Sequence, residues 1–266
     1  MAFVRINGVL LHYRLHGPAG APALALVNSL GTDDRIWDPV VDLLADDYRI
    51  ISYDKRGHGL SDAPPGDYSL DDHIDDLSGL LDHIGVDRFA LAGVSIGGVI
   101  AQGFAVRYGA RLAALVLCDT APKFADPAFW TARIDAIRSN GLASITDGIM
   151  ERWFSPRFRS EHPDELAGWR NMFERSDLDG YIASCATLRD TDLTAAIGTI
   201  SAPTLVVVGE EDGSSPVELV RATAAAIPGA RFEIIPSAGH IPSIEQPAAL
   251  AALIIPFLKE AGHGGY

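Results

Sequence analysis

FALAGVSIGG, residues 89–98, is the stretch of sequence that decides the fold. Its first part is an apolar run typical of a buried strand, and a helical pattern follows Ser95. Gly93 and Gly97 lie two residues before and two residues after that serine, where any Cβ would collide with the crossing backbone. The pattern predicts a strand, a sharp turn and a helix, with Ser95 in a strained conformation that exposes its hydroxyl.

The helix after Ser95 would begin with main-chain N–H groups that have no partner inside the helix. These donors and the positive end of the helix dipole can hold the anion that forms when a serine attacks a carbonyl group. The stretch therefore indicates an acyl-transfer site. Glycine and serine are common residues, so the prediction depends on a base and an acid supplied by other parts of the chain.

The length and composition of the chain indicate one domain with at most an inserted lobe. With 266 residues, 48% of them hydrophobic and 21% charged, the chain can bury a substantial core. No apolar run reaches the roughly 18 residues that span a bilayer. Arg5 and Asn7 interrupt the first apolar stretch, where a signal peptide would have its core. We therefore expect a cytoplasmic protein without a membrane partner.

Charge and cysteine content disfavour other classes of protein. The formal net charge of -14 argues against nucleic-acid binding, which needs clustered Lys and Arg side chains. An anionic ligand would therefore require a local cationic pocket. Cys118 and Cys185 cannot build a disulfide framework and lack a metal-binding spacing, so we expect both to be buried packing residues.

Apolar runs separated by helical patterns predict an α/β fold. Asn7-Gly8 is a turn-favouring dipeptide, and most of the later apolar runs are continuous, as in strands buried on both faces. Strands are expected at residues 3–6, 9–15, 23–28, 48–53, 89–92, 112–118, 204–208 and 231–235. Helices are expected at residues 37–45, 70–84, 95–107, 216–226 and 248–261. This alternation predicts a mostly parallel, eight-stranded sheet with helices on both faces.

The alternation stops in the middle of the chain. Between Ala121 and Ser201 there is no clear buried strand, and helix-like spacing occurs at residues 130–137, 145–153 and 165–175. We interpret this segment as an inserted helical cap (122–200) on a single domain (1–266, with its core at 1–121 and 201–266). Because the cap leaves the sheet after one strand and returns before the next, it should cover the carboxyl ends of the strands, where such sheets bind ligands.

A base for Ser95 is expected in the loop after the last predicted strand. His240 lies there, in the polar segment Ser-Ala-Gly-His-Ile, and can reach the same edge of the sheet as Ser95. A serine hydroxyl needs such a base to take its proton at neutral pH. His58 also follows a predicted strand, but it precedes Ser95 in the chain, and we expect it to have a structural role in a turn.

The acid that supports His240 has two candidate positions. Asp212 follows the seventh predicted strand, whereas Asp119 follows the sixth. Either carboxylate could stabilise the imidazolium from behind. Asp212 is preferred because its loop should lie beside the loop of His240. Glu210 and Glu211 occur in the same segment, and we expect their side chains to be solvated.

An oxyanion hole needs two hydrogen-bond donors. One should be the main-chain N–H of Ile96, which directly follows Ser95. The other should come from residues 28–31, Asn-Ser-Leu-Gly, directly after the third predicted strand, and we assign it to the N–H of Leu30. Both donors are main-chain groups, so the identity of the side chain does not matter for this task.

These residues lie in segments that resemble the α/β-hydrolases along the whole chain, and most of all the 3-oxoadipate enol-lactonases, which open a lactone late in the degradation of aromatic acids. The core motifs are shared by many α/β-hydrolases, whereas residues 28–31 and the motif around Trp153 are more selective. The similar segments are residues 28–32 with Trp37, 53–59, 93–98, 115–121, 151–154, 180–181 with Cys185, and 239–241.

The resemblance implies an α/β-hydrolase fold with a triad of Ser95, Asp212 and His240 and with oxyanion donors at Leu30 and Ile96. It implies a serine hydrolase of the beta-ketoadipate pathway that opens 3-oxoadipate enol-lactone, a small molecule, to 3-oxoadipate through an acyl-enzyme. That chemistry requires no metal and no organic cofactor. A carboxylesterase or a carbon–carbon bond hydrolase would use the same machinery, and a non-catalytic ligand receptor of this fold is a further alternative.

The enol-lactone carries a free carboxylate, so its pocket in this acidic chain would need a cation. Residues 122–200 hold nine of the 21 basic residues, eight of them arginines, although twelve acidic residues leave the segment at a net charge of -3. Arginine suits bidentate binding of carboxylates. Arg133 and Arg152 are the candidate substrate-binding residues, with Trp130 and Trp153 as candidate pocket walls. Each of the four could instead be a solvated or packing residue of the cap.

Overall fold

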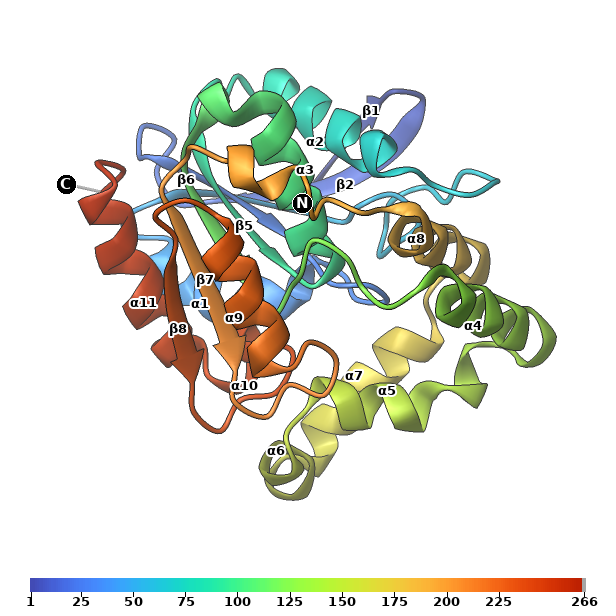
Figure 1. Ribbon diagram of the computed structural model, residues 1–266. Helices are drawn as coiled ribbons and strands as arrows, with labels where there is room; N and C mark the ends of the chain where they lie inside the picture. The colour runs from blue at the N-terminus through green and yellow to red at the C-terminus, as the bar shows by residue number, and fades with distance from the viewer. Residues whose placement is uncertain (265–266) are drawn as a thin grey trace.

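Eight strands form one sheet within residues 1–264, the part of the chain that this computed structural model describes (Figure 1). Residues 265–266, which the expected domain includes, lie outside the described residues. The order is β1-β2-β4-β3-β5-β6-β7-β8; β2 runs antiparallel to β1 and β4, and all other neighbours are parallel. The strands are β1 (Ala2–Ile6), β2 (Val9–His16), β3 (Ala23–Val27), β4 (Arg49–Tyr53), β5 (Phe89–Val94), β6 (Leu112–Cys118), β7 (Thr204–Gly209) and β8 (Arg231–Ile235). The predicted mostly parallel, eight-stranded sheet is therefore confirmed.

Burial explains the sequence patterns of the strands. β3, β5, β6 and β7 are buried at every residue, and their sequences are continuous apolar runs, as expected when both faces of a strand are covered. β1, at the edge of the sheet, alternates between exposed and half-buried residues. Asn7 and Gly8, with φ of 50° and 84°, form the tight turn that folds β2 back along β1, as their sequence predicts.

Helices flank the sheet on both faces. In Figure 1 α9 (Val217–Ala226) lies in front of the sheet and α1 (Asp38–Leu44) lies behind it. α3 (Ile96–Tyr108) packs against β5 and β6. The other helices of this part are α2 (Leu70–Ile84), α10 (Pro242–Glu245) and α11 (Pro247–Glu260). α10 was not predicted, because four residues are too few to show a helical period. No helix within residues 1–264 is both long and apolar enough to cross a membrane.

Between β6 and β7 the chain leaves the sheet and forms a separate group of helices. They are α4 (Pro127–Asn140), α5 (Thr146–Trp153), α6 (Pro156–Glu161), α7 (Pro163–Glu174) and α8 (Leu178–Asp190). In Figure 1 this group, coloured from green to gold, lies beside the sheet rather than on either of its faces. β6 and β7 are parallel neighbours, so the segment leaves the sheet at the carboxyl end of β6.

Helical spacing predicted α4, α5 and α7 but not α6 and α8. α4 also has clear start signals, since Asp126 accepts a hydrogen bond from the N–H of Phe129 and a proline follows the cap. α8 is buried at every residue from Gly180 to Leu188. It therefore lacks the polar face whose spacing would reveal a helix in the sequence.

Candidate active site

Ser95 lies at the turn between β5 and α3, with φ of 58° and ψ of -122°. A non-glycine residue rarely adopts a positive φ, so its surroundings must hold this conformation. The Ser95 N–H donates to the carbonyl of Cys118 at 3.0 Å, and the hydroxyl of Thr120 donates to the Ser95 carbonyl at 2.7 Å. A Cβ on Gly93 would meet the carbonyl of Gly97, and one on Gly97 would meet the main chain of β3. The backbone thus has the strained turn that the glycine spacing predicts.

His240 is held between the core and the helices that follow β6. It is 2% exposed and lies in the loop after β8. The main-chain N–H of His240 donates to the carbonyl of Trp153, the last residue of α5, at 2.9 Å. Glu245 in α10 accepts hydrogen bonds from the N–H of Gly239 at 2.8 Å and from the hydroxyl of Ser155 at 2.6 Å. These bonds fasten the histidine loop to the end of α5.

Asp212, in the loop after β7, is the hydrogen-bond partner of His240. Its Oδ2 lies 2.9 Å from Nδ1 of His240, and both side chains are buried. Its Oδ1 accepts from the N–H groups of Ser214 and Ser215 at 2.6 and 3.0 Å. Burial opposes ionisation, but the charge of His240 and these hydrogen bonds outweigh it, and the pKa of Asp212 falls below its ordinary value. An ionised carboxylate can only accept, so Nδ1 of His240 carries the proton of this hydrogen bond.

Asp119, the alternative acid, lies close to this pair in a different environment. One ligand atom from each of Asp119, Asp212 and His240 lies within 4.8 Å of the others. Oδ1 of Asp119 accepts from the last N–H of β7 at 2.8 Å. Burial and then the negative charge of Asp212 raise the pKa of Asp119 well above its ordinary value, which favours its protonated form. Glu210 and Glu211 are exposed, as expected. Of the described acidic residues near His240, Asp212 is the one that forms a hydrogen bond with its side chain.

The two main-chain N–H groups proposed as oxyanion donors belong to Leu30 and Ile96. Ser29 and Leu30, in the loop after β3, line the same cavity as Ser95. No acceptor within residues 1–264 takes the N–H of Leu30. Ile96 is the first residue of α3, so its N–H has no partner within the helix. Neither N–H group proposed from the sequence has a hydrogen-bond acceptor within the described residues.

His58 supports the loop that carries Leu30. It is buried; its Nε2 accepts the N–H of Gly31 at 2.9 Å, and its Nδ1 lies 3.1 Å from the carbonyl of Arg56. Burial and then the positive charge of Lys55 lower the pKa of His58 well below its ordinary value. A neutral ring with its proton on Nδ1 satisfies both contacts. The structural role expected for His58 is thus to hold this loop.

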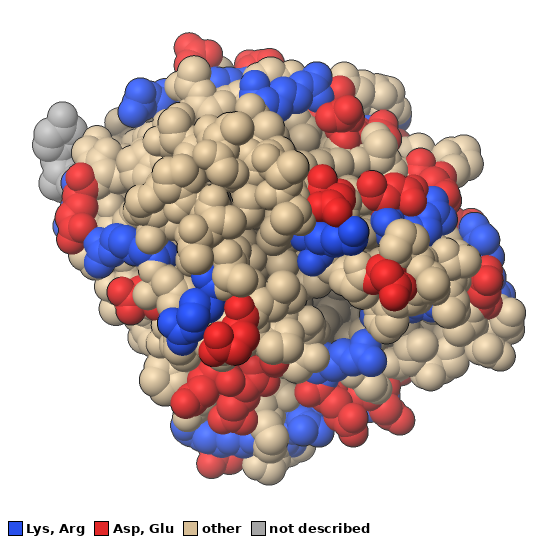
Figure 2. All heavy atoms as spheres, in the orientation of Figure 1, with Lys and Arg blue, Asp and Glu red and all other residues tan. Residues whose placement is uncertain are grey.

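A cavity of about 310 Å³ lies over Ser95, between the core and the helices α4 to α8. In Figure 2 the surface is hollowed where these two parts meet, and basic side chains lie beside the hollow. The residues that line the cavity, all of them described, are Ser29, Leu30, Ser95, Phe124, Ala125, Phe129, Trp130, Arg133, Ile149, Arg152, Trp153, Tyr181, Leu188, Gly213, Ser214, Leu219 and His240. They include two arginines and no carboxylate, although the net charge of the chain is -14. The cavity is a cationic pocket in an acidic protein.

All four residues proposed to bind the substrate line this cavity. Arg133 is half-buried, donates to the hydroxyl of Tyr181 at 2.6 Å and lies 5.5 Å from the ring centre of Trp130. Arg152 is exposed, and neither arginine forms an ion pair with a carboxylate within residues 1–264. Trp130 and Trp153 are both buried, so each packs among the helices and also walls the cavity.

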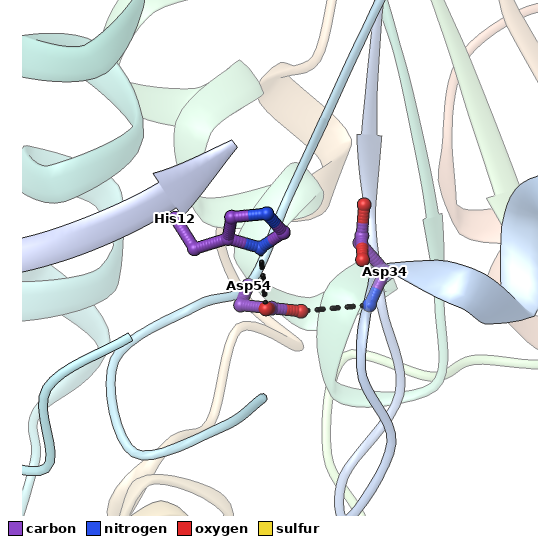
Figure 3. A group of neighbouring side chains, drawn as sticks. All are labelled: His12, Asp34 and Asp54. Atoms are coloured by element: carbon purple, nitrogen blue, oxygen red, sulfur yellow. Dashed lines mark hydrogen bonds and ion pairs between the residues drawn. The ribbon is translucent and has the colours of Figure 1, made fainter. Parts of the chain in front are cut away.

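A second buried cluster lies outside the cavity lining. Figure 3 shows His12 and Asp34 on either side of Asp54. Nδ1 of His12 lies 2.8 Å from one carboxylate oxygen of Asp54, and the N–H of Asp34 donates to the other oxygen at 2.8 Å. The N–H of Leu60 also donates to Asp54 at 2.9 Å. Protein donors thus occupy both oxygens, and the cluster fixes the turn after β4 rather than presenting an open metal site.

Several supporting residues were not foreseen from the sequence. Ser215 lies three residues after Asp212, and its hydroxyl donates to Oδ2 at 2.8 Å; an aspartate followed by Gly-Ser-Ser is a recognisable turn signal for this contact. The roles of Glu245 and Lys55 could not be seen in the local sequence, because their contacts join segments that are distant in sequence. Tyr181 was indicated only by its place in a segment that resembles the enol-lactonases.

Residues 15–253 match the alpha/beta hydrolase family, and the chain belongs to that family and is a hydrolase. It is similar to 3-oxoadipate enol-lactonase 2 of Acinetobacter baylyi, with 32% identity over 91% of this chain and 90% of the relative. It is also similar to the crystal structure of the enol-lactonase from Burkholderia xenovorans, with 34% identity, a TM-score of 0.94 and coverage of 97% and 100%. A thermophilic esterase of Thermogutta terrifontis, solved with malate bound, is 31% identical, with a TM-score of 0.93 and coverage of 98% and 99%. The predicted fold and family resemblance are therefore confirmed.

Proposed function

We propose that this chain is a serine hydrolase that opens 3-oxoadipate enol-lactone to 3-oxoadipate through an acyl-enzyme. One observation carries the proposal: a single cavity combines Ser95 and the His240–Asp212 pair with Arg133 and Arg152. The first three residues suit attack on an ester carbonyl, and the arginines suit a substrate with a free carboxylate. The similarity to two enol-lactonases supports the same substrate.

The reaction begins at Ser95. Its Oγ attacks the lactone carbonyl carbon while Nε2 of His240 takes the hydroxyl proton. The ionised Asp212 stabilises the imidazolium through the hydrogen bond to Nδ1. The carbonyl oxygen becomes an anion and accepts hydrogen bonds from the N–H groups of Leu30 and Ile96.

Ring opening follows when the bond between the acyl carbon and the ring oxygen breaks. The leaving group is an enolate, a weaker base than an alkoxide; it takes the proton from His240, and the enol then becomes a ketone. A water molecule, deprotonated by His240, attacks the acyl-enzyme, and the proton returns to Oγ of Ser95 as 3-oxoadipate leaves. Each proton that leaves Ser95 or water is thus passed on by His240, and the enzyme returns to its starting protonation state.

We assign the substrate carboxylate to the arginines of the cap. Neither arginine is neutralised by an acidic partner of the described chain, so both retain their charge for a ligand. The Tyr181 hydroxyl orients the guanidinium of Arg133. We also infer that residues 122–200 work as a cap on one domain with the core, because the histidine loop is bonded to the end of α5.

A carboxylesterase for other anionic or small esters is the second candidate. The similarity to the Thermogutta terrifontis esterase favours it, and the same residues would perform the same steps. A carbon–carbon bond hydrolase would also use this serine and histidine. A non-catalytic receptor is the remaining alternative, and the ionised Asp212 bonded to a buried His240 and the strained Ser95 favour an enzyme over it.

The proposal is tested by comparing turnover of 3-oxoadipate enol-lactone with turnover of uncharged p-nitrophenyl esters. We expect kcat/KM to be at least roughly 100-fold higher on the enol-lactone, because its carboxylate would gain charge-assisted hydrogen bonds. Equal or higher efficiency on a neutral ester would contradict the lactonase assignment and leave the esterase assignment standing.

Ser95→Ala provides the matched control for the serine mechanism. The wild-type chain should release a burst of p-nitrophenol and react covalently with a fluorophosphonate, and Ser95→Ala should do neither. A receptor would show no burst in either protein. A burst that survives in Ser95→Ala would place the nucleophile elsewhere.

A further inference from the structure

Lys55 is buried next to the loop that carries Leu30. The residue is 1% exposed, and its Nζ donates a hydrogen bond to the carbonyl of Ser29 at 2.6 Å. Lysine is almost never fully buried without a partner, because it is costly to remove an ammonium group from water. Burial lowers the pKa of Lys55 well below its ordinary value, although the charges of Asp54 and Asp33 oppose this shift. An apolar side chain could occupy this position at lower cost, which points to a use for the amine.

The bond from Lys55 is the shortest of those that hold one peptide plane, since the carbonyl of Ser29 also accepts from Asn28 and Thr32 at 3.0 to 3.4 Å. The carbonyl of Ser29 and the N–H of Leu30 belong to the same peptide, and in a trans peptide these two groups point in opposite directions. Lys55 is buried, so the carbonyl that it binds is turned toward the interior and the N–H is turned away from Lys55. Ser29 and Leu30 line the cavity together with Ser95, which is the side where an anion formed at Ser95 would lie. The hydroxyl of Thr32 donates to the same carbonyl at 3.0 Å.

The turn that carries Lys55 is itself fixed at both ends. Asp54, directly before Lys55, is held by main-chain donors and by the side chain of His12 (Figure 3). Further along the turn, His58 accepts the N–H of Gly31 at 2.9 Å. The same turn therefore grips the loop after β3 on both sides of Leu30, at the carbonyl before it and at the N–H after it.

We propose that Lys55 is a positioning residue for the oxyanion hole: its amine holds the Ser29–Leu30 peptide so that the Leu30 N–H faces the developing anion. A donor on the carbonyl oxygen also polarises the peptide and makes its N–H a stronger donor. The inference rests on the proposed serine-hydrolase function and extends it to a residue outside the cavity lining. Because the anion exists only during the chemical steps, loss of the amine should lower kcat more than it raises KM.

Lys55→Met tests this role, because methionine is similarly long, flexible and easily buried. We expect kcat for a p-nitrophenyl ester to fall by roughly 10- to 100-fold, with KM changed by less than about threefold. The affinity for a boronic acid, which forms a tetrahedral adduct on Ser95, should fall by a similar factor. Lys259→Met, the same change at an exposed lysine in α11, should leave both quantities unchanged.

An unchanged kcat in a folded Lys55→Met variant would overturn the assignment, and so would a raised KM at constant kcat. If Lys55→Met does not fold, Lys55→Leu and Lys55→Ala are tested in its place, since each removes the same donor from the Ser29 carbonyl. A fall in kcat of at least roughly tenfold at nearly constant KM supports the assignment, and an unchanged kcat in either folded variant overturns it. A wild-type chain that forms neither the boronic acid adduct nor the burst overturns the serine-hydrolase proposal and the role of Lys55 together. A reactive wild-type chain with an equally reactive Lys55→Met overturns only the role of Lys55.

Discussion

The cavity has a core side and a cap side, and their polar groups are held differently. On the core side Ser95, Asp212 and His240 follow strands, and main-chain or side-chain hydrogen bonds fix each of them. On the cap side Arg133 has one hydrogen bond to Tyr181, and Arg152 has no ion pair with the described chain. The core side keeps its groups in one geometry, whereas the cap side keeps its charges free.

This difference matches two chemical tasks. Proton transfer between a serine, a histidine and a leaving group requires hydrogen-bond distances that are set before the substrate arrives. Binding of a substrate carboxylate requires instead that a positive charge has not already been neutralised by the protein. Substitutions on the core side should therefore lower turnover of every ester, and substitutions on the cap side should change the preference among esters.

The largest effect is expected from Asp212→Asn on the core side. Asparagine fits the site but cannot stabilise the imidazolium, and its amide can force the wrong tautomer on His240. We expect kcat to fall by about 10³- to 10⁴-fold on both the enol-lactone and a neutral ester. Steady-state kinetics on the two substrates measure the effect.

Asp119→Asn is the matched control for that experiment. The pKa of Asp119 is raised well above its ordinary value, so an uncharged amide replaces a carboxyl group that already favours its protonated form. We expect less than about a tenfold fall in kcat. A large loss in Asp119→Asn with a small loss in Asp212→Asn would reassign the acid.

The core side could largely be predicted from the sequence, because its residues follow the carboxyl ends of strands. Continuous apolar runs locate the buried strands β5 and β7, and parallel strands bring their carboxyl ends to one edge, so Ser95, His240 and Asp212 were expected together. Cys118 and Cys185 are both buried and free, as predicted. The spacing alone left Asp119 open, because β6 and β7 are neighbours and either strand end is near the histidine loop.

The cap side was harder to predict, because its contacts depend on tertiary packing. The count of arginines showed that residues 122–200 are rich in arginine, at a net charge of -3, but not which arginines would stay unpaired. Arg170, for example, forms an ion pair with Asp147 of another helix, whereas Arg133 is not paired with a carboxylate. α8 brings Tyr181 next to Arg133, and the buried stretch of this helix, residues 180–188, shows no helical period in the sequence.

A smaller and selective effect is expected from Arg133→Met on the cap side. Loss of a charge-assisted hydrogen bond to the substrate carboxylate should lower kcat/KM on the enol-lactone by roughly 10- to 100-fold. The same variant should change kcat/KM on a neutral ester by less than about threefold. Arg152→Met should behave in the same way if both arginines bind the carboxylate.

Arg170→Met provides the control, because that arginine is already paired with Asp147 and Glu174. It should not alter the ratio of the two efficiencies. Equal losses on both substrates in Arg133→Met would show that Arg133 supports the packing of the cap through Trp130 and Tyr181 rather than binding an anion.

The smallest effect concerns Asp119 and the stability of the core side. An aspartate in the unfolded chain ionises near its ordinary pKa of about 3.9. In the folded protein, burial and the charge of Asp212 raise the pKa of Asp119 well above that value. Between the two values the folded state keeps a proton that the unfolded state has lost. This stabilising contribution is therefore complete below about pH 4 and is lost as the pH rises, by up to about 1.4 kcal/mol per pH unit, until the folded-state pKa is passed.

Asp119→Asn removes this pH dependence, because asparagine does not titrate. Relative to the wild-type chain, the free energy of unfolding of the variant should rise between about pH 5 and pH 8. Urea unfolding of both proteins at each pH measures the difference, and Asp46→Asn, at an exposed position, gives the baseline. If the free energies of unfolding of the wild-type chain and of Asp119→Asn changed with pH in the same way, Asp119 would already be ionised in the folded protein. His240 would then face two buried carboxylates, and both could share in stabilising the imidazolium.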